Sequence, residues 1–255
     1  MALHHLTWSA RGRLALFPSE DARRAALRAL ARVAGDQILL FGLADDHLHL
    51  VSPQAGPLAR AVLLALRPLA ASTLDPAHLR PVEDRTHLSW LVTYLLGQPD
   101  KHRLPGHPAL WTGSCFPDLV GARRLFPGIA GRLAAQLPRY RLRQAYEHLG
   151  LAPAPLVPAD DEATRAAGAS RILAAAGAVL AAGPDLSGKT AERVLARKAA
   201  AIVAGQCGIH STELAWALGQ PARSARRLAG DAVEPALLTA VRLRLSLEDR
   251  VRGSG

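Results

Sequence analysis

Two histidines stand one residue apart in the segment His47-Leu48-His49, inside an otherwise apolar run. Side chains at positions i and i+2 of a β-strand lie on the same face, so His47 and His49 would lie side by side while Leu48 enters the core. Two neutral imidazoles held in this way can form half of a divalent-metal site. Strand histidines are also common as structural or exposed side chains, so this pair indicates chemistry only if further groups join it.

Tyr94 and Gln98 are the residues that we expect to complete the site. They are four apart on an expected helix and therefore share one face of it. A tyrosine hydroxyl is a weak nucleophile unless its phosphate target is polarised and the line of attack is fixed. A metal held by His47, His49 and the amide oxygen of Gln98 could do both, and this ligand set suits Mg²⁺ or Mn²⁺. Tyr94 is then the candidate nucleophile.

The elements that must position these residues follow from the residue pattern. Alternation and turn signals predict strands over 3–9, 37–44, 47–52 and 79–83. Helices are expected over 20–34 (with Ser19 as N-cap), 57–72, 86–98 and 139–149, and the stretch 105–127 is expected to be irregular. The order strand, helix, strand, strand, helix, strand, helix favours an α+β fold: a ferredoxin-like antiparallel sheet with helices on one face.

A stretch rich in proline and alanine follows this first domain. It predicts a division into a domain over residues 1–149, a linker over 150–160 and an all-α domain over 161–252. Helices are expected over 164–182 and 190–206, and a pair over 211–218 and 222–229 is a helix-turn-helix candidate. Its second helix carries three arginines that suit a DNA major groove, although an ordinary helical hairpin with solvated cations is the alternative. These arginines are Arg223, Arg226 and Arg227.

The chain of 255 residues has a formal net charge of +10, from 31 lysines and arginines against 21 acidic residues. A balance of this size makes a polyanion the expected partner, while a surface shaped only by codon bias is the alternative. The two cysteines, Cys115 and Cys207, fit no metal-ligand spacing and are expected to be reduced and structural. No apolar run reaches membrane-spanning length and no signal-peptide pattern is present, so we expect a cytoplasmic protein without a membrane partner.

The motifs together resemble a known family. A His-hydrophobic-His strand, followed by a helix reading Tyr94-Leu95-Leu96-Gly97-Gln98-Pro99, is similar to the single-tyrosine HUH transposases, and most of all to the REP-associated tyrosine transposases, whose helix reads Tyr-x-x-x-Asn-Pro. The segments 7–12 and 111–114 resemble that family's first strand with its Arg-Gly turn and its Trp-x-x-Ser segment. The family usually has Asn where this chain has Asp46. The resemblance covers about residues 1–125, and the C-terminal helices resemble a DNA-binding module related to the initiator DnaA.

The resemblance implies an HUH fold and a metal-dependent transesterification on single-stranded hairpin DNA. Tyr94 would attack a phosphodiester and form a 5′-phosphotyrosine link, leaving a 3′-hydroxyl. The C-terminal domain would contact duplex DNA, and the protein would act as a monomer or a homodimer. Trp8 and Trp90 could stack on bases, but we expect both in the core. Further candidate phosphate contacts are Arg11, Arg13, Lys101 and Arg103.

Two other interpretations stay open from the sequence. One is a domesticated DNA-binding regulator that keeps the fold but does not cleave DNA. The other is a metal-dependent hydrolase unrelated to DNA; amidohydrolases also carry His-x-His after a strand, but their further His, Lys and Asp ligands do not follow here. The presence of His47, His49, Tyr94 and Gln98 together favours the enzyme, since a regulator does not need all four. The charge and the helix-turn-helix candidate favour a DNA partner.

Overall fold

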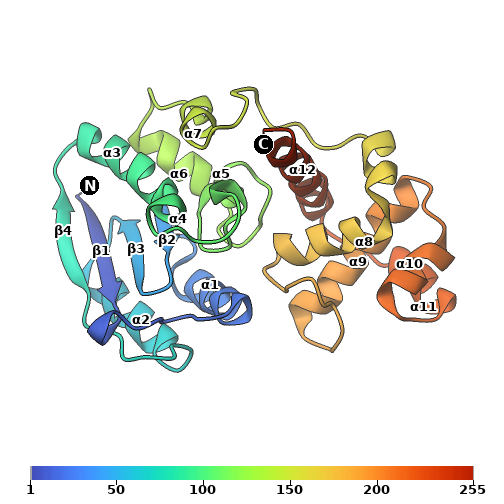
Figure 1. The fold of residues 1–255 in the computed structure, drawn as a ribbon, viewed down its shortest axis with the longest axis horizontal. Coiled ribbons are helices and arrows are strands. Elements are labelled where there is room, and N and C mark those ends of the chain that lie inside the picture. The colour runs from blue at the N-terminus through green and yellow to red at the C-terminus, as the bar shows by residue number, and fades with distance from the viewer. Residues whose placement is uncertain (1, 255) are drawn as a thin grey trace. The chain divides into compact units, whose positions relative to one another are not determined.

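The computed structural model describes residues 2–254, apart from the side chain of Arg13. The chain forms two compact units (Figure 1). The first unit consists of residues up to 119 together with 125–155, and it contains the sheet. The second unit consists of residues 120–124 and 156–253, and its regular elements are all helices.

The first unit is α+β and is built on a four-stranded antiparallel sheet with the strand order β2-β3-β1-β4. The two inner strands, β3 and β1, begin and end where the sequence predicts, whereas β4 lies one residue earlier. The strand β2 is shorter than predicted because residues before it still belong to the turn after the first helix, where Gln37 N–H donates to the Ala34 carbonyl. The strands are β1 (Leu3–Ser9), β2 (Leu40–Leu43), β3 (His47–Ser52) and β4 (His78–Val82).

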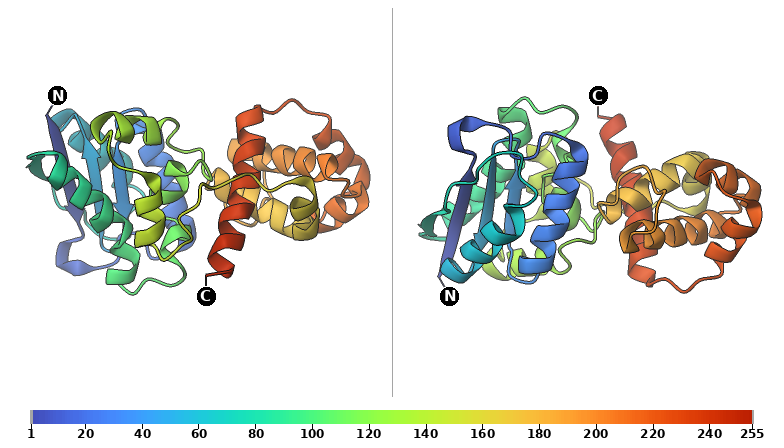
Figure 2. Two further views of the ribbon diagram at one scale, coloured as in Figure 1. Left: turned by 90° about the horizontal axis from the view of Figure 1, so that it is seen from above. Right: turned by 90° about the horizontal axis from the view of Figure 1, so that it is seen from below.

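Helices cover both faces of this sheet, so the expectation that they lie on one face is wrong. Figures 1 and 2 show α1 (Glu20–Ala34) and α2 (Gly56–Leu66) together on one face and α3 (Arg85–Leu96) on the other. The reason is the burial of β3, in which both Leu48 and Val51 are fully buried although they point to opposite faces. A strand with apolar side chains on both faces needs cover on both.

Two prolines determine the helix ends that were not predicted correctly. α2 ends at Leu66 rather than at residue 72, because Pro68 has no N–H to continue the helix. α3 ends at Leu96, and Pro99 lies in the first turn of a new short helix, α4 (Gln98–Lys101), where a missing N–H costs nothing.

The rest of the first unit is more regular than predicted. The stretch 105–127 contains a 3₁₀ turn (Pro108–Leu110) and the short helix α5 (Phe116–Leu119). The helix α6 (Ile129–Gln136) was not predicted, and α7 (Leu142–His148) is shorter than expected.

The second unit packs five helices around a core rich in alanine. α8 begins after Asp160, whose carboxylate accepts from the Ala163 N–H at 2.8 Å, and α9 begins after the cap Thr190. α8 and α9 lie side by side (Figure 1), and small side chains in their contact allow a close approach. None of the described helices is long and apolar enough to cross a membrane. The helices are α8 (Asp161–Val179), α9 (Ala191–Gln206), α10 (Ser211–Leu218), α11 (Ala222–Ala229) and α12 (Pro235–Arg252).

Candidate functional site

The strand β3 places His47 and His49 on the same face, with their ring centroids 4.7 Å apart and the rings nearly perpendicular. His49 pairs across the sheet with Thr7 on one side and with Gly42 on the other. A side chain at Gly42 would touch Leu95, so α3 crosses the sheet at the one position of β2 that has no side chain. This close approach brings α3 over the two histidines.

The crossing brings Tyr94 against His49. Their ring centroids are 5.5 Å apart and the rings meet edge to face at 76°. The tyrosine is half-buried, so its ring is held while part of the side chain still reaches solvent.

Gln98 reaches the histidines although it does not share a helix with Tyr94. It is the first residue of α4, directly after Gly97, and only 2% of it is exposed. Its Nε2 donates to the Tyr94 carbonyl at 3.2 Å, and a carbonyl can only accept, so the amide oxygen must point the other way. That oxygen, Oε1, lies 3.1 Å from Nε2 of His47. The structure therefore brings His47, Gln98 and Tyr94 together by a route that the sequence analysis did not foresee.

Asp46 fixes the tautomer of His47. Its Oδ1 lies 2.6 Å from Nδ1 of His47, and an ionised carboxylate only accepts, so Nδ1 carries the proton. In the neutral ring the lone pair of Nε2 then faces the lone pairs of Gln98 Oε1. Two acceptors at this distance repel unless a cation or a proton lies between them. A carboxylate behind a ligating imidazole is the usual support in metal sites.

His49 offers a second ring nitrogen that no hydrogen bond uses. Its Nδ1 meets Nε2 of His5 at 3.0 Å and Oγ1 of Thr7 at 3.1 Å. Its Nε2 is buried and has no hydrogen-bond partner among the described residues. Burial, with a further contribution from His47, lowers the pKa of His49 to about 2, so the ring is neutral as a metal ligand requires. An unpartnered buried nitrogen costs free energy in an empty site, and a metal ion would use it.

The donor set fits a divalent ion. His47 Nε2, His49 Nε2 and Gln98 Oε1 are two imidazole nitrogens and one neutral oxygen, which are donor types that divalent cations accept, with water as a further ligand. A second group overlaps with it: Asp46, His47 and His102 offer ligand atoms within 4.8 Å of one another. The sequence analysis did not assign His102, although it lies four residues after Gln98 and so on the same side of the chain's helical turn.

Aromatic and cationic groups surround Tyr94. Trp90, one turn earlier on α3, stacks on it at 4.8 Å and 17°, and Nζ of Lys101 lies 5.0 Å from the centroid of its ring. Trp90 is 55% exposed, so its expected place in the core is wrong, whereas Trp8 is fully buried as expected. Trp90 lies on the solvent side of α3 because the opposite side of that helix carries Leu91, Val92 and Leu95 into the core.

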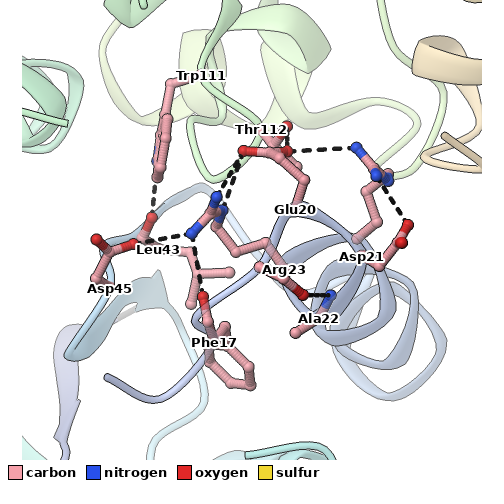
Figure 3. Close-up of polar contacts among 11 residues, drawn as sticks. Phe17, Glu20, Asp21, Ala22, Arg23, Leu43, Asp45, Trp111 and Thr112 are labelled. Atoms are coloured by element: carbon pink, nitrogen blue, oxygen red, sulfur yellow. Dashed lines mark hydrogen bonds and ion pairs between the residues drawn. The ribbon is translucent and has the colours of Figure 1, made fainter. Parts of the chain in front are cut away.

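A buried arginine fixes the turn that leads into β3. Figure 3 shows the guanidinium of Arg23 between Asp45, Glu20 and the carbonyl of Phe17, with nitrogen–oxygen distances of 2.9, 2.8 and 3.1 Å. The same group lies 4.7 Å from the ring centroid of Trp111. Asp45 directly precedes Asp46, so this network holds the residues that in turn orient His47. Arg23 is 7% exposed, and only this burial shows its structural role.

The segment 111–114, which resembled a family motif, lies along the outer edge of β2. Leu43 N–H donates to the Gly113 carbonyl, and Trp111 Nε1 donates to the Leu43 carbonyl, both at 2.9 Å. Ser114 forms an isolated bridge with Gly42. The motif therefore supports the sheet under the site and does not enter the site itself.

The candidate phosphate contacts of the first unit lie at its surface. Arg11 is exposed and forms an ion pair with Asp75 at 3.3 Å, and the side chain of Arg13 lies outside the described residues. Lys101 and Arg103 are exposed at and just after α4, beside Tyr94 in the first case.

The candidate contacts of the second unit share one short helix. All three are exposed on α11, and within the described chain none of them has an ion pair or a side-chain hydrogen bond; they are Arg223, Arg226 and Arg227. Trp216 on the neighbouring α10 is 89% exposed, and the sequence analysis did not single it out.

Comparisons of the chain with models of protein families, with curated proteins and with solved structures give no match. The function must therefore be argued from the site.

Proposed function

We propose that this protein is a metal-dependent endonuclease and strand transferase that acts on single-stranded, hairpin-forming DNA through Tyr94. The observation that carries the proposal is the buried Nε2 of His49, which has no hydrogen-bond partner among the described residues. The same strand carries His47, whose Nε2 lies 3.1 Å from Gln98 Oε1, and Tyr94 packs on the ring of His49. The strand order β2-β3-β1-β4 supports a ferredoxin-like domain of the HUH type, since it places His-x-His on an inner strand.

In this proposal, the reaction is a transesterification with Tyr94 as the nucleophile. The hydroxyl of Tyr94 gives up its proton to solvent and its oxygen forms a bond to phosphorus. The bond from phosphorus to the 3′-oxygen breaks, and the departing oxygen takes up a proton from solvent as a 3′-hydroxyl. Attack of a second 3′-hydroxyl on the phosphotyrosine reverses these changes and joins two strands without a nucleotide cofactor. A bound Mg²⁺ or Mn²⁺ would neutralise charge on the non-bridging phosphate oxygens.

The fixed groups around Tyr94 support its assignment as the nucleophile. Stacking against Trp90 and edge contact with His49 restrict the ring, and restriction of a nucleophile lowers the entropic part of the barrier. Lys101 beside the ring adds a positive charge where a phosphate must approach.

In this proposal the second unit would bind duplex DNA. Its α10 and α11 are joined through Gly219 in a left-handed conformation, which gives the tight turn that a helix-turn-helix needs. The unpaired, exposed arginines of α11 support a phosphate or groove contact, because no acidic side chain of the described residues competes for them.

The test is a covalent-adduct assay. The full-length protein is incubated with a pool of labelled single-stranded hairpin DNAs and Mn²⁺ and run on a denaturing gel, beside Tyr94→Phe and the control Tyr140→Phe. We expect a labelled band of slow mobility that Tyr94→Phe and chelation of the metal remove and Tyr140→Phe keeps. The absence of a band from every pool, with DNA binding intact, would instead identify a non-cleaving DNA-binding regulator.

A further inference from the structure

A pocket of about 330 Å³ opens next to Tyr94, and His47 is not among the residues that line it. It lies between the edge strand β4, strand β1 and the first turns of α3, and its chemically active lining residues are His5, Arg80, Glu83, His87, Trp90 and Tyr94. Its volume is at the small end of the range of roughly 300–1,000 Å³ for small-molecule sites. The pocket shares Tyr94 and Trp90 with the candidate site, whereas Arg80, Glu83 and His87 have no role in the proposed reaction.

One wall of the pocket is aromatic. Trp90 keeps more than half of its surface exposed, although a large apolar side chain of this kind is normally covered. It is stacked in parallel on Tyr94, so the indole is held in a fixed orientation. A fixed, exposed indole is a platform on which a planar ring can stack, as in proteins that bind single-stranded nucleic acid.

The other walls offer hydrogen bonds of both kinds. The backbone N–H of Glu83 donates to Nδ1 of His87 at 3.3 Å, so the proton of the neutral ring is on Nε2, which is left as a donor. Arg80 and Glu83 are exposed and form no ion pair within the described residues. The pocket thus combines a free guanidinium, which suits a phosphate, with a free carboxylate, which accepts from an amino group.

We propose that this pocket binds one unpaired nucleotide, stacked on Trp90, and that it selects a base with an exocyclic amino group through Glu83. Arg80 contacts the phosphate of the same nucleotide. Such a base carries the donor that a carboxylate needs, whereas thymine lacks it. The inference rests on the proposed function only for the source of the nucleotide, which would be the strand that Tyr94 cleaves. The pocket would then fix which phosphate lies next to the hydroxyl.

The test uses the four deoxynucleoside monophosphates dAMP, dCMP, dGMP and dTMP, titrated by NMR into the full-length protein. We expect dTMP to bind most weakly. Trp90→Ala should weaken binding of the other three by roughly 5- to 100-fold, the usual effect of losing one stacked base. Glu83→Ala should remove the preference against dTMP while stacking remains. Trp216→Ala, which removes an exposed indole of the other unit, is the matched control and should change nothing.

Other results would separate this inference from the proposed function. If Trp216→Ala lowers mononucleotide affinity as much as Trp90→Ala does, or if Trp90→Ala leaves that affinity unchanged, the pocket does not bind the nucleotide. This holds whatever the result of the adduct assay. Mononucleotide binding that depends on Trp90, in a protein that forms no adduct with any DNA, would support the pocket and count against the cleavage reaction alone. A folded state unchanged in Trp90→Ala by circular dichroism excludes unfolding as the cause.

Discussion

The two units carry their candidate functional residues in opposite ways. In the first unit, His49 and Gln98 are almost completely buried, and each has its orientation set by neighbours such as Thr7 and the Tyr94 carbonyl. In the second unit, Arg223, Arg226 and Arg227 on α11 are exposed and form no ion pair with any described residue. A reaction that breaks a bond needs groups fixed to fractions of an ångström, whereas attraction between cations and phosphates acts over several ångströms and tolerates mobile side chains.

This difference has a cost in stability at the candidate site of the first unit. The buried Nε2 of His49 has no hydrogen-bond partner among the described residues, which is unfavourable. Groups arranged against their own stability are characteristic of functional sites. The arginines of α11 cost nothing of this kind, because water solvates them.

The largest effect is expected from His49→Ala. Loss of this ligand should slow adduct formation by at least about 10³-fold, since a metal at phosphate oxygens supplies several kcal/mol. In the unchanged protein, Mn²⁺ at 100 times its dissociation constant should stabilise the fold by about 2.7 kcal/mol, seen as a higher unfolding temperature, and His49→Ala should abolish that rise. Arg226→Ala should keep both properties. If His49→Ala forms the adduct at a normal rate, His49 is not a metal ligand, and the ligands would instead be those of the group containing His102.

A substitution outside the site, Gly113→Ala, should lower the stability of the first unit and leave that of the second unit unchanged. A Cβ at this position would overlap the Leu43 carbonyl, so the segment must move away from β2, at about 2–3 kcal/mol. In the control Gly131→Ala, the new Cβ lies in open space on α6. This substitution should stabilise the first unit by up to about 1 kcal/mol. Hydrogen exchange resolved by peptide measures both units at once. Equal loss of protection in the second unit would show that the two units do not unfold independently.

Asp46 should contribute a smaller but measurable part of the site. Asp46→Ala removes the acceptor behind His47 and should lower metal affinity and the rate of adduct formation by roughly 10- to 100-fold. Asp46→Asn keeps an oxygen that accepts from Nδ1 and should lose less. Calorimetric titration with Mn²⁺ measures the affinities, and equal affinities in all three proteins would rule out the supporting role of Asp46.

The smallest effects should come from the second unit, and they should depend on salt. Each alanine substitution at Arg223, Arg226 or Arg227 should lower the slope of log affinity against log salt concentration by about 0.9 if that arginine contacts a phosphate of duplex DNA. Fluorescence anisotropy on a labelled duplex measures the slope, with the exposed Arg60 of α2 as the control position. Adduct formation on a short hairpin should not change. A large loss of the adduct rate would mean that this surface takes part in the reaction.

The sequence alone predicts the inner strands well because their signals are local. The alternation before Ser9 and the turn before His47 bound β1 and β3 without reference to any other element. It predicts the ends of α2 and α3 poorly. Pro68 ends α2 although the apolar pattern continues beyond it, and Pro99 lies in the first turn of a new short helix instead of only closing α3.

The sequence predicts which side chains of the candidate site come together but not which neighbours support them. His47, His49, Tyr94 and Gln98 follow from spacing, yet Gln98 reaches His47 from a different helix than expected. The contacts of His5 and Thr7 with His49 depend on the register between β1 and β3, which no local pattern sets. Burial of Arg23 and exposure of Trp90 likewise depend on which helix covers which face.

The segment along β2 also bears on aggregation. An exposed outer strand is a template on which other chains can form cross-β pairs. In this sheet, Gly113 and Trp111 occupy the N–H and carbonyl of Leu43, and Arg132 donates to the carbonyl of Ile38 at 3.0 Å just before β2. At the opposite edge, Pro81 removes one N–H from β4. A chain emerging from the ribosome therefore exposes the edge of β2 until residues 111–132 have been made, and that interval is when self-association would begin.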